Sequence, residues 1–271
     1  MNGALGNNQS FNNLWQGWLS LSEKEITTKV DVLQSGRRPL LEILIQCINK
    51  IQKKNIKILE IGCGTGVTSM TLAMKTDAIV TACDLSGESL KVARYIQETI
   101  KCPQISFLQA DTMALPFDDR SFDIVFSQGV MEHFPSPLPG LREQARILAP
   151  SGILVVDVPQ KINPYALYKR VQIKKQIWPY GWETDFTKFD LRKWEQHLGL
   201  DLQQIKGYGY GFKEDYGFSA LRFLGYRLKS QKKWPILQPI GDLIDIVHLP
   251  IEKRWGHLFM QNIVGVFQKL K

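Results

Sequence analysis

Cysteine is scarce in this 271-residue sequence, and the cysteines form no C-x-x-C pair and show no metal-ligand spacing: Cys47, Cys63, Cys83 and Cys102. This pattern excludes a disulfide-stapled scaffold and predicts reduced thiols in a cytosolic protein. Residues 1–13 lack the apolar core of a signal peptide. No uncharged apolar run approaches the ~20 residues that span a bilayer. We therefore expect a cytoplasmic protein that does not cross a membrane.

An excess of charge is absent from most of the chain, and the net charge of +8 comes from its last two fifths. Residues 1–159 carry 15 basic and 16 acidic side chains, a net of −1, whereas residues 160–271 carry 19 and 10, a net of +9. The basic part could face an anionic substrate, lipid head groups or nucleic acid, or it could be an ordinary lysine-rich surface. With 44% apolar and 10% aromatic residues, the chain can fill the core of one domain with or without a cap.

A short apolar run at residues 56–61 is followed by three glycines spaced two apart: Gly62, Gly64 and Gly66. The run predicts a buried strand, the glycines allow a sharp turn, and residues 67–74 can continue as a helix. A strand, a glycine turn and a helix form the nucleotide-binding corner of a doubly wound α/β fold. The spacing G-x-G-x-G differs from the G-x-G-x-x-G of dinucleotide sites, which opposes a nicotinamide oxidoreductase. Glu60 would repel a pyrophosphate here, so its carboxylate favours a ligand with a positive group.

Two later predicted strands, residues 78–84 and 105–111, each end in an acidic residue, Asp84 and Asp111. A carboxylate at the end of the second strand can hydrogen-bond both hydroxyls of a ribose held across the glycine turn. A turn or helix-capping role is the alternative for Asp84. Ser86 is predicted to cap the helix that follows. Further strands are expected at residues 122–126, 152–159, 202–208 and 262–267, and further helices at 37–50, 141–148, 165–178 and 191–198.

Three sequence strings resemble one known family: E-I-G-C-G-T-G, A-D-T followed by A-L-P-F-D-D-R-S-F-D, and R-I-L-A-P-S-G-I-L. The first resembles motif I of class I S-adenosylmethionine (SAM) methyltransferases. The others are similar to their type 11 group, which includes methyltransferases of ubiquinone and menaquinone biosynthesis. The resemblance covers about residues 50–160. It implies a Rossmann-like, doubly wound α/β sheet of seven strands with the last strand antiparallel, SAM as cofactor and S-adenosylhomocysteine (SAH) as product.

The resemblance also implies which residues bind the cofactor. In this family the acid after the third strand often accepts a hydrogen bond from the adenine amino group, and the residues after the fourth strand face the methionine part. The expected cofactor-binding residues are Glu60, Gly62, Cys63, Gly64, Gly66, Asp84, Leu85, Asp111, Thr112, Ser127 and Gln128.

His133 is the candidate general base, because it follows the fourth strand on the expected ligand edge and its imidazole titrates near neutrality. The alternative is that Glu132 and His133 open a helix and hold local structure. Some quinone O-methyltransferases carry an upstream glutamate that helps to bind a metal. Gly129 occupies that place here, so we expect no metal site.

The sequence divides into a core and three less regular parts. We predict an N-terminal cap helix at residues 1–36, the SAM-binding core at 37–160, a lid insertion at 161–200, and the end of the sheet at 201–271 with a second cap insertion at about 209–258. The apolar residues of the predicted helix at 165–178 fall into two stripes, which favours a lid that touches both the core and a ligand or lipid. The aromatic turn Trp178–Trp182 could line an acceptor pocket.

These observations together predict methyl transfer from SAM to a small lipophilic or aromatic acceptor, by O- or C-methylation. One alternative is an enzyme that methylates nucleic acid or protein through the basic C-terminal region, although we expect no nucleic-acid partner. Another is a SAM-binding regulatory subunit without turnover. The expected partners are the small acceptor and, in addition, a peripheral membrane contact, while the oligomeric state is left open.

Overall fold

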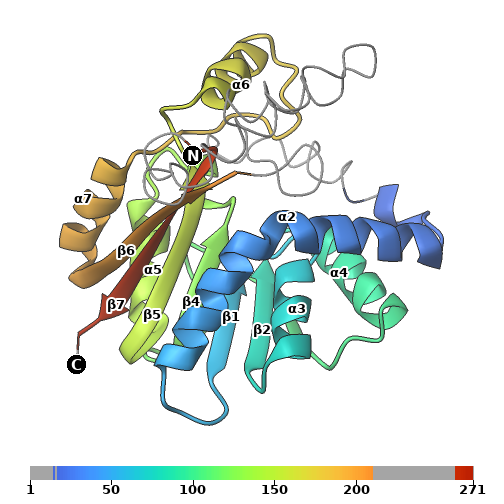
Figure 1. The fold of residues 1–271 in the computed structure, drawn as a ribbon, viewed down its shortest axis with the longest axis horizontal. Helices are drawn as coiled ribbons and strands as arrows, with labels where there is room; N and C mark the ends of the chain where they lie inside the picture. The colour runs from blue at the N-terminus through green and yellow to red at the C-terminus, as the bar shows by residue number, and fades with distance from the viewer. Residues whose placement is uncertain (1–14, 16, 210–259, 271) are drawn as a thin grey trace, which may run out of the picture.

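The computed structural model describes residue 15 and residues 17–209 and 260–270. They form a seven-stranded sheet in the order β3-β2-β1-β4-β5-β7-β6 (Figure 1). β7 runs antiparallel to both β5 and β6, and the other neighbouring pairs are parallel, so the predicted doubly wound sheet is confirmed. The strands are β1 Lys57–Ile61, β2 Ile79–Asp84, β3 Ser106–Gln109, β4 Phe122–Gln128, β5 Leu148–Pro159, β6 Leu200–Tyr208 and β7 Asn262–Lys269.

Helices cover both faces of the sheet. Alternate residues of a strand point to opposite faces, and in β1 Ile58 belongs to one buried cluster while Leu59 belongs to the other. The first cluster includes residues of α2, α3 and α4, and the second includes residues of α5 and α7. Because both faces of the sheet are buried, successive residues of a central strand must all be apolar, and its sequence is a continuous apolar run. The helices are α2 Glu23–Lys50, α3 Val67–Lys75, α4 Gly87–Thr99, α5 Leu138–Ile147, α6 Pro164–Lys174 and α7 Lys188–Leu198, with a 3-10 turn at Met131–His133.

Helix α2 differs from the sequence prediction, because it begins at Glu23 and not near residue 37. Ser22 and Glu25 form a capping box at its start. Pro39 therefore lies in the helix interior, whereas a helix that began at residue 37 would have it in the first turn. A proline inside a helix removes one backbone hydrogen bond and bends the helix, and Figure 1 shows α2 changing direction along its length.

The remaining elements agree with the predictions apart from their ends. Ser86 accepts a hydrogen bond from Ser89 N and caps α4, and Gly199 ends α7 with a left-handed φ of 62°. β3 stops at Gln109, two residues before Asp111. The predicted insertion at about 209–258 falls almost wholly outside the described residues. None of the helices in the described ranges is long and apolar enough to cross a membrane.

Residues 161–187 leave the carboxyl end of β5 and return to it, and we call them the lid segment. Lys161 N donates to Phe186 O at 2.7 Å, and Phe186 N donates to Pro159 O at 2.9 Å, which closes the segment at its base. α6 lies within the lid segment, beyond the edge of the sheet (Figure 1). α7, which the sequence analysis grouped with the lid, contacts α5, β6 and β7 instead.

Candidate functional site

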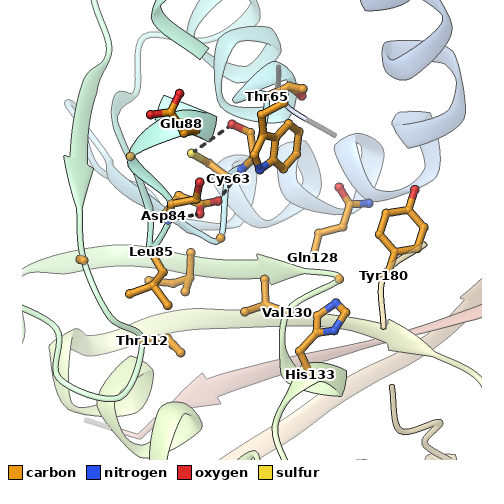
Figure 2. Close-up of a pocket in the computed structure, with 18 of the residues that line it drawn as sticks. Cys63, Thr65, Asp84, Leu85, Glu88, Thr112, Gln128, Val130, His133 and Tyr180 are labelled. Carbon is orange, nitrogen blue, oxygen red and sulfur yellow. Dashed lines mark hydrogen bonds between the residues drawn. The ribbon is translucent and has the colours of Figure 1, made fainter. Parts of the chain in front are cut away.

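A cavity of about 640 Å³ lies at the carboxyl ends of β1, β2 and β4. This is the edge where open α/β sheets bind ligands, and the volume falls in the range of small-molecule sites. In Figure 2, Asp84, Leu85 and Thr112 lie toward one end of the cavity, and His133 and Tyr180 lie toward the other. Eight of the expected cofactor residues line it: Gly62, Cys63, Gly64, Asp84, Leu85, Asp111, Thr112 and Gln128. Three do not: Glu60, Gly66 and Ser127.

The glycine turn keeps the cavity floor open. Gly62 has a φ of +65°, and a Cβ on it would lie 2.4 Å from Val130 Cγ2. Gly64 has a φ of +53°, and its Cβ would lie 3.0 Å from the ring of Trp15. Larger residues would strain the backbone at both positions and fill the space in which a ligand could rest on it. The turn therefore forms a cradle of bare backbone at the cavity floor, which a side chain at either position would narrow.

Asp84 organises this turn as well as facing the cavity. One carboxylate oxygen accepts a hydrogen bond from Gly64 N at 2.8 Å, and the other accepts one from Ser86 N at 2.9 Å. Burial raises the pKa of Asp84, and the hydrogen bonds from the Ser86 and Gly64 amides oppose this rise. The side chain is thus fixed at the end of β2, where it lines the cavity.

Two other expected adenosine contacts lie along the same wall. Asp111 follows β3, and its Oδ1 accepts a hydrogen bond from Met113 N at 2.8 Å. Thr112 is buried next to it. Cys63 is also buried, and burial raises the pKa of its thiol well above the ordinary 9.0, so it contributes shape to the cavity and not a thiolate.

Glu60 points away from the cavity. It is 2% exposed, and its Oε2 accepts hydrogen bonds from Ser69 N at 3.1 Å and Ser69 Oγ at 2.5 Å. Since residues two apart on a strand share a face, Glu60 follows Ile58 toward α2 and α3. The sequence predicted that this carboxylate would contact a cationic ligand. In the structure it is hydrogen-bonded to Ser69 and does not line the cavity. Glu60 instead anchors the first turn of α3 behind the glycines.

The buried carboxyl of Glu60 should make the protein less stable as the pH rises. Burial raises the pKa of Glu60 from 4.5 to about 7, against the opposing hydrogen bonds from Ser69 and the charge of Arg37. Between these values the folded state keeps a proton that the unfolded state has released, so the free energy of unfolding falls with pH and then levels off above about 7. Across this interval, wild type should lose about 3 kcal/mol more than Glu60→Gln. Urea unfolding at a series of pH values measures the difference, and parallel curves for the two proteins would refute it.

The other end of the cavity is built on a buried polar network. Gln128 lines the cavity, and its Nε2 donates to Asp157 Oδ2 and to Tyr208 Oη, each at 3.1 Å. Asp157 also accepts hydrogen bonds from the Tyr208 hydroxyl and, at 3.0 Å, from Asn262 Nδ2. Burial raises the pKa of Asp157 to about 6, although these hydrogen bonds oppose the rise. Side chains from strands β5, β6 and β7 therefore fix the position of the Gln128 side chain at the end of β4.

His133 follows β4 on the short 3-10 turn and reaches the cavity wall beside Tyr180 (Figure 2). Burial lowers the pKa of His133 from 6.5, and the charge of Glu183 opposes this shift. The adjacent Glu132 is buried, and burial together with the charge of Glu183 raises its pKa well above 4.5. At neutral pH the imidazole is therefore predominantly neutral, which is the form that can accept a proton.

The lid segment is bound to this turn. Thr184 N donates to Glu132 O at 2.9 Å. Within the segment, the Lys169 ammonium lies 2.8 Å from Glu183 Oε2 and 2.6 Å from Asp185 Oδ1. The lid segment thus carries Tyr180 to the cavity and is fastened to the turn that carries His133. Within the aromatic turn, Tyr180 is the residue that lines the cavity. That this turn contributes to an acceptor pocket stays a prediction.

The cavity also includes residues of the N-terminal region. Trp15 and Trp18 both line the cavity. Arg37 was not singled out from the sequence, yet it lines the cavity and its Nη1 donates to Thr68 Oγ1 at 3.2 Å. Only the path of α2 across the sheet brings it there. The described residues include no group of three or more His, Cys, Asp or Glu side chains that could hold a metal ion.

The sheet order, the glycine cradle and the acid at the end of β2 define a class I methyltransferase core. A family model described as "Methyltransferase domain" matches residues 59–156. A demethylmenaquinone methyltransferase of Staphylococcus aureus is 33% identical over 201 residues, which cover 67% of this chain and 80% of that protein. The chain belongs to the SAM-dependent methyltransferase family (EC 2.1.1.-), and the cofactor of this family is SAM.

Two further comparisons extend over more of this chain, one by sequence and one by structure. A sterol 24-C-methyltransferase of Gibberella zeae is 26% identical over 80% of this chain and 55% of its own length. Phosphoethanolamine N-methyltransferase 2 of Haemonchus contortus, solved with phosphomonomethylethanolamine and SAH, superposes with a TM-score of 0.55 at 17% identity. The superposition covers 84% of this chain and 52% of that protein. At this sequence identity the similarity shows the fold alone. The chain spans about half or less of the length of several curated relatives.

Proposed function

We propose that the protein transfers the methyl group of SAM to a small lipophilic or aromatic acceptor that binds between Tyr180 and His133. The proposal rests on one observation, that the same cavity extends from the glycine cradle to His133 and Tyr180. The sterol 24-C-methyltransferase and the demethylmenaquinone methyltransferase, whose names state lipophilic acceptors, support this class of acceptor. SAM supplies an activated methyl group on a positively charged sulfur.

The residues of this chain would then hold the donor in an extended pose. Asp84 would accept hydrogen bonds from the two ribose hydroxyls, and Asp111 and Thr112 would contact the adenine. At the other end the amino-acid part would meet Gln128 and Arg37, whose positive charge suits a carboxylate. His133, which lines the same cavity, would then lie on the side of the acceptor.

Bound SAM would supply its methyl carbon to an electron pair of the acceptor atom, and the electrons of the broken carbon–sulfur bond would stay on sulfur to give SAH. If the acceptor atom carries a proton, His133 takes it and becomes positively charged. Alignment and the exclusion of water supply most of the rate, and the tryptophans of the N-terminal region and Tyr180 narrow the cavity for this purpose.

A labelling experiment tests this function. The protein is incubated with methyl-labelled SAM and cell extract, and the products are separated into organic-soluble, aqueous and macromolecular fractions. We expect the label in the organic-soluble fraction. Label confined to RNA or protein would instead indicate the macromolecular methyltransferase, and SAM binding without any labelled product would indicate a regulatory subunit.

His133→Ala should lower turnover by about 100-fold while leaving the affinity for SAM nearly unchanged, because a general base acts only in the transfer step. In the wild type, turnover should fall as the pH drops through the lowered pKa of His133, and this acid limb should disappear in the variant. Steady-state kinetics over a pH series measures both effects. Full activity in His133→Ala would show that Glu132 and His133 serve local structure only.

A further inference from the structure

Helix α6 presents two apolar stripes, and the structure shows where each one points. One stripe faces inward, where Ala166 and the stem of Lys169 are each 1% exposed. The other faces outward, where Leu167 is 64%, Tyr168 55% and Val171 42% exposed. In a helix, positions four and seven residues after Leu167 share its side, whereas positions one and eight residues after it lie about 100° and 80° around the axis, next to that side. The outward stripe therefore continues into two exposed lysines, Lys174 and Lys175.

Large apolar side chains are also exposed at both ends of this helix. Ile162 before it and Ile177 after it are each 61% exposed, and Trp182 in the following turn is 45% exposed. Isolated exposed apolar residues are ordinary, but a cluster in one segment marks an interaction surface. We call Ile162, Leu167, Tyr168, Val171, Ile177 and Trp182 the apolar lid face.

The charge around the apolar lid face has one sign. Residues 160–178 contain five lysines and arginines and no aspartate or glutamate. Lys169 is neutralised by Glu183 and Asp185, and Arg170 pairs with Asp185. Lys174 and Lys175 form no ion pair with any residue that the structure describes. Within the described part of the chain, the face therefore combines exposed apolar side chains with unpaired positive charge.

Aromatic rings connect the apolar lid face to the cavity. The Tyr165 ring lies 6.1 Å from the Trp178 ring, which lies 5.7 Å from the Tyr180 ring. Tyr180 in turn lines the cavity near His133. α6 stands beyond the carboxyl edge of the sheet, clear of both helical layers (Figure 1). A surface that rests on α6 would therefore lie next to the acceptor end of the cavity.

We propose that the apolar lid face docks on an anionic lipid bilayer. Helices that bind at such an interface bury an apolar face among the acyl chains and place lysines at the head groups. The inward stripe of α6 does not enter the bilayer, because it holds the lid segment to the core. This inference rests on the proposed function in one respect, since docking there would bring a lipophilic acceptor from the bilayer directly to the mouth of the cavity.

Vesicle co-sedimentation tests the docking without requiring turnover. The full-length protein should bind vesicles of phosphatidylcholine mixed with phosphatidylglycerol and bind phosphatidylcholine vesicles much more weakly. Lys174→Ala/Lys175→Ala should lower partitioning to anionic vesicles by about 30-fold, given the usual contribution of each lysine near such a surface. The matched control is Lys54→Ala/Lys75→Ala, which removes two exposed lysines elsewhere and should change little.

The apolar part is tested with Leu167→Glu/Val171→Glu, which should abolish vesicle binding. Val32→Glu is its control, because Val32 is 67% exposed on α2. If residues 210–259 cover this face instead, the double variant would lower the melting temperature. If a second copy of the chain covers it, the variant would lower the molecular mass in solution. Either result with unchanged vesicle binding would overturn the proposal. Failure of the wild-type protein to co-sediment with anionic vesicles would also overturn the proposal. SAM titration by calorimetry on each variant keeps failure of docking separate from failure of the proposed function.

Discussion

Replacing Asp84 by alanine is expected to weaken SAM binding by about 100-fold or more. The carboxylate is held by Gly64 N and Ser86 N at the end of β2, where it faces the cavity. A hydrogen bond to a charged group contributes about 1.5–3 kcal/mol, and two ribose hydroxyls would make two of them. A tenfold change in affinity corresponds to about 1.4 kcal/mol, which gives the stated loss.

Isothermal titration calorimetry with both SAM and SAH makes this test specific. The two ligands share the ribose and differ in the charge on sulfur, so a ribose contact predicts equal losses for both. A larger loss for SAM would mean that Asp84 acts through attraction to the sulfonium, as the sequence had suggested for Glu60. Asp77→Ala, an exposed acid just before β2, is the matched control and should leave both affinities unchanged. Unaltered SAM affinity in a folded Asp84→Ala protein would contradict the ribose assignment.

The sequence carried enough information for the sheet and for the cavity floor. Strands buried on both faces appear as continuous apolar runs. The glycines at 62 and 64 have no alternative that tolerates both a left-handed φ and the close approach of Val130 or Trp15. The sequence signals themselves are local, because a continuous apolar run and a set of three closely spaced glycines can each be recognised from neighbouring residues, even though the contacts with Val130 and Trp15 cannot.

The sequence carried less information on which way individual charged groups point. Glu60 was interpreted as a ligand contact because it stands beside the glycines, although its alternation with Ile58 places it on the helix-covered face. Arg37 reaches the cavity only because α2 is continuous past Pro39 and crosses the sheet. Such placements depend on tertiary packing, so neither periodicity nor spacing encodes them.

The same limit explains Lys169, which in the sequence is one of many basic residues and in the structure is the most buried of the charged lid residues. Its ammonium is enclosed by Glu183 and Asp185, whose side chains are 8% and 4% exposed. Burial disfavours the charge, yet the two carboxylates outweigh it and raise the pKa of Lys169 above 10.5. A pairing between residues that are 14 and 16 positions apart cannot be read from local pattern.

Replacing Lys169 by methionine is therefore expected to open the lid segment. Methionine keeps much of the stem volume but leaves two carboxylates buried without their cation, and breaking a buried pair in this way costs about 3–5 kcal/mol. Because the lid segment touches the core through few hydrogen bonds at its base, the loss should appear as local opening. Amide hydrogen exchange in α6 should accelerate by about 100-fold or more, whereas exchange in β1 and β4 should not change.

Arg170→Met is the matched control, since Arg170 is adjacent and pairs with the same Asp185, but its side chain is 44% exposed. Pairs at exposed sites contribute about 0–1 kcal/mol, so exchange in α6 should change by less than about tenfold. Because Thr184 N donates to Glu132 O, opening of the lid segment in Lys169→Met should also release the His133 turn and lower turnover more than SAM affinity. Equal exchange rates of the α6 amides in the two variants would contradict this prediction. They would mean that the buried ion pairs of Lys169 stabilise the lid segment no more than the exposed pair of Arg170 does, so that the hydrogen bonds at its base hold the segment.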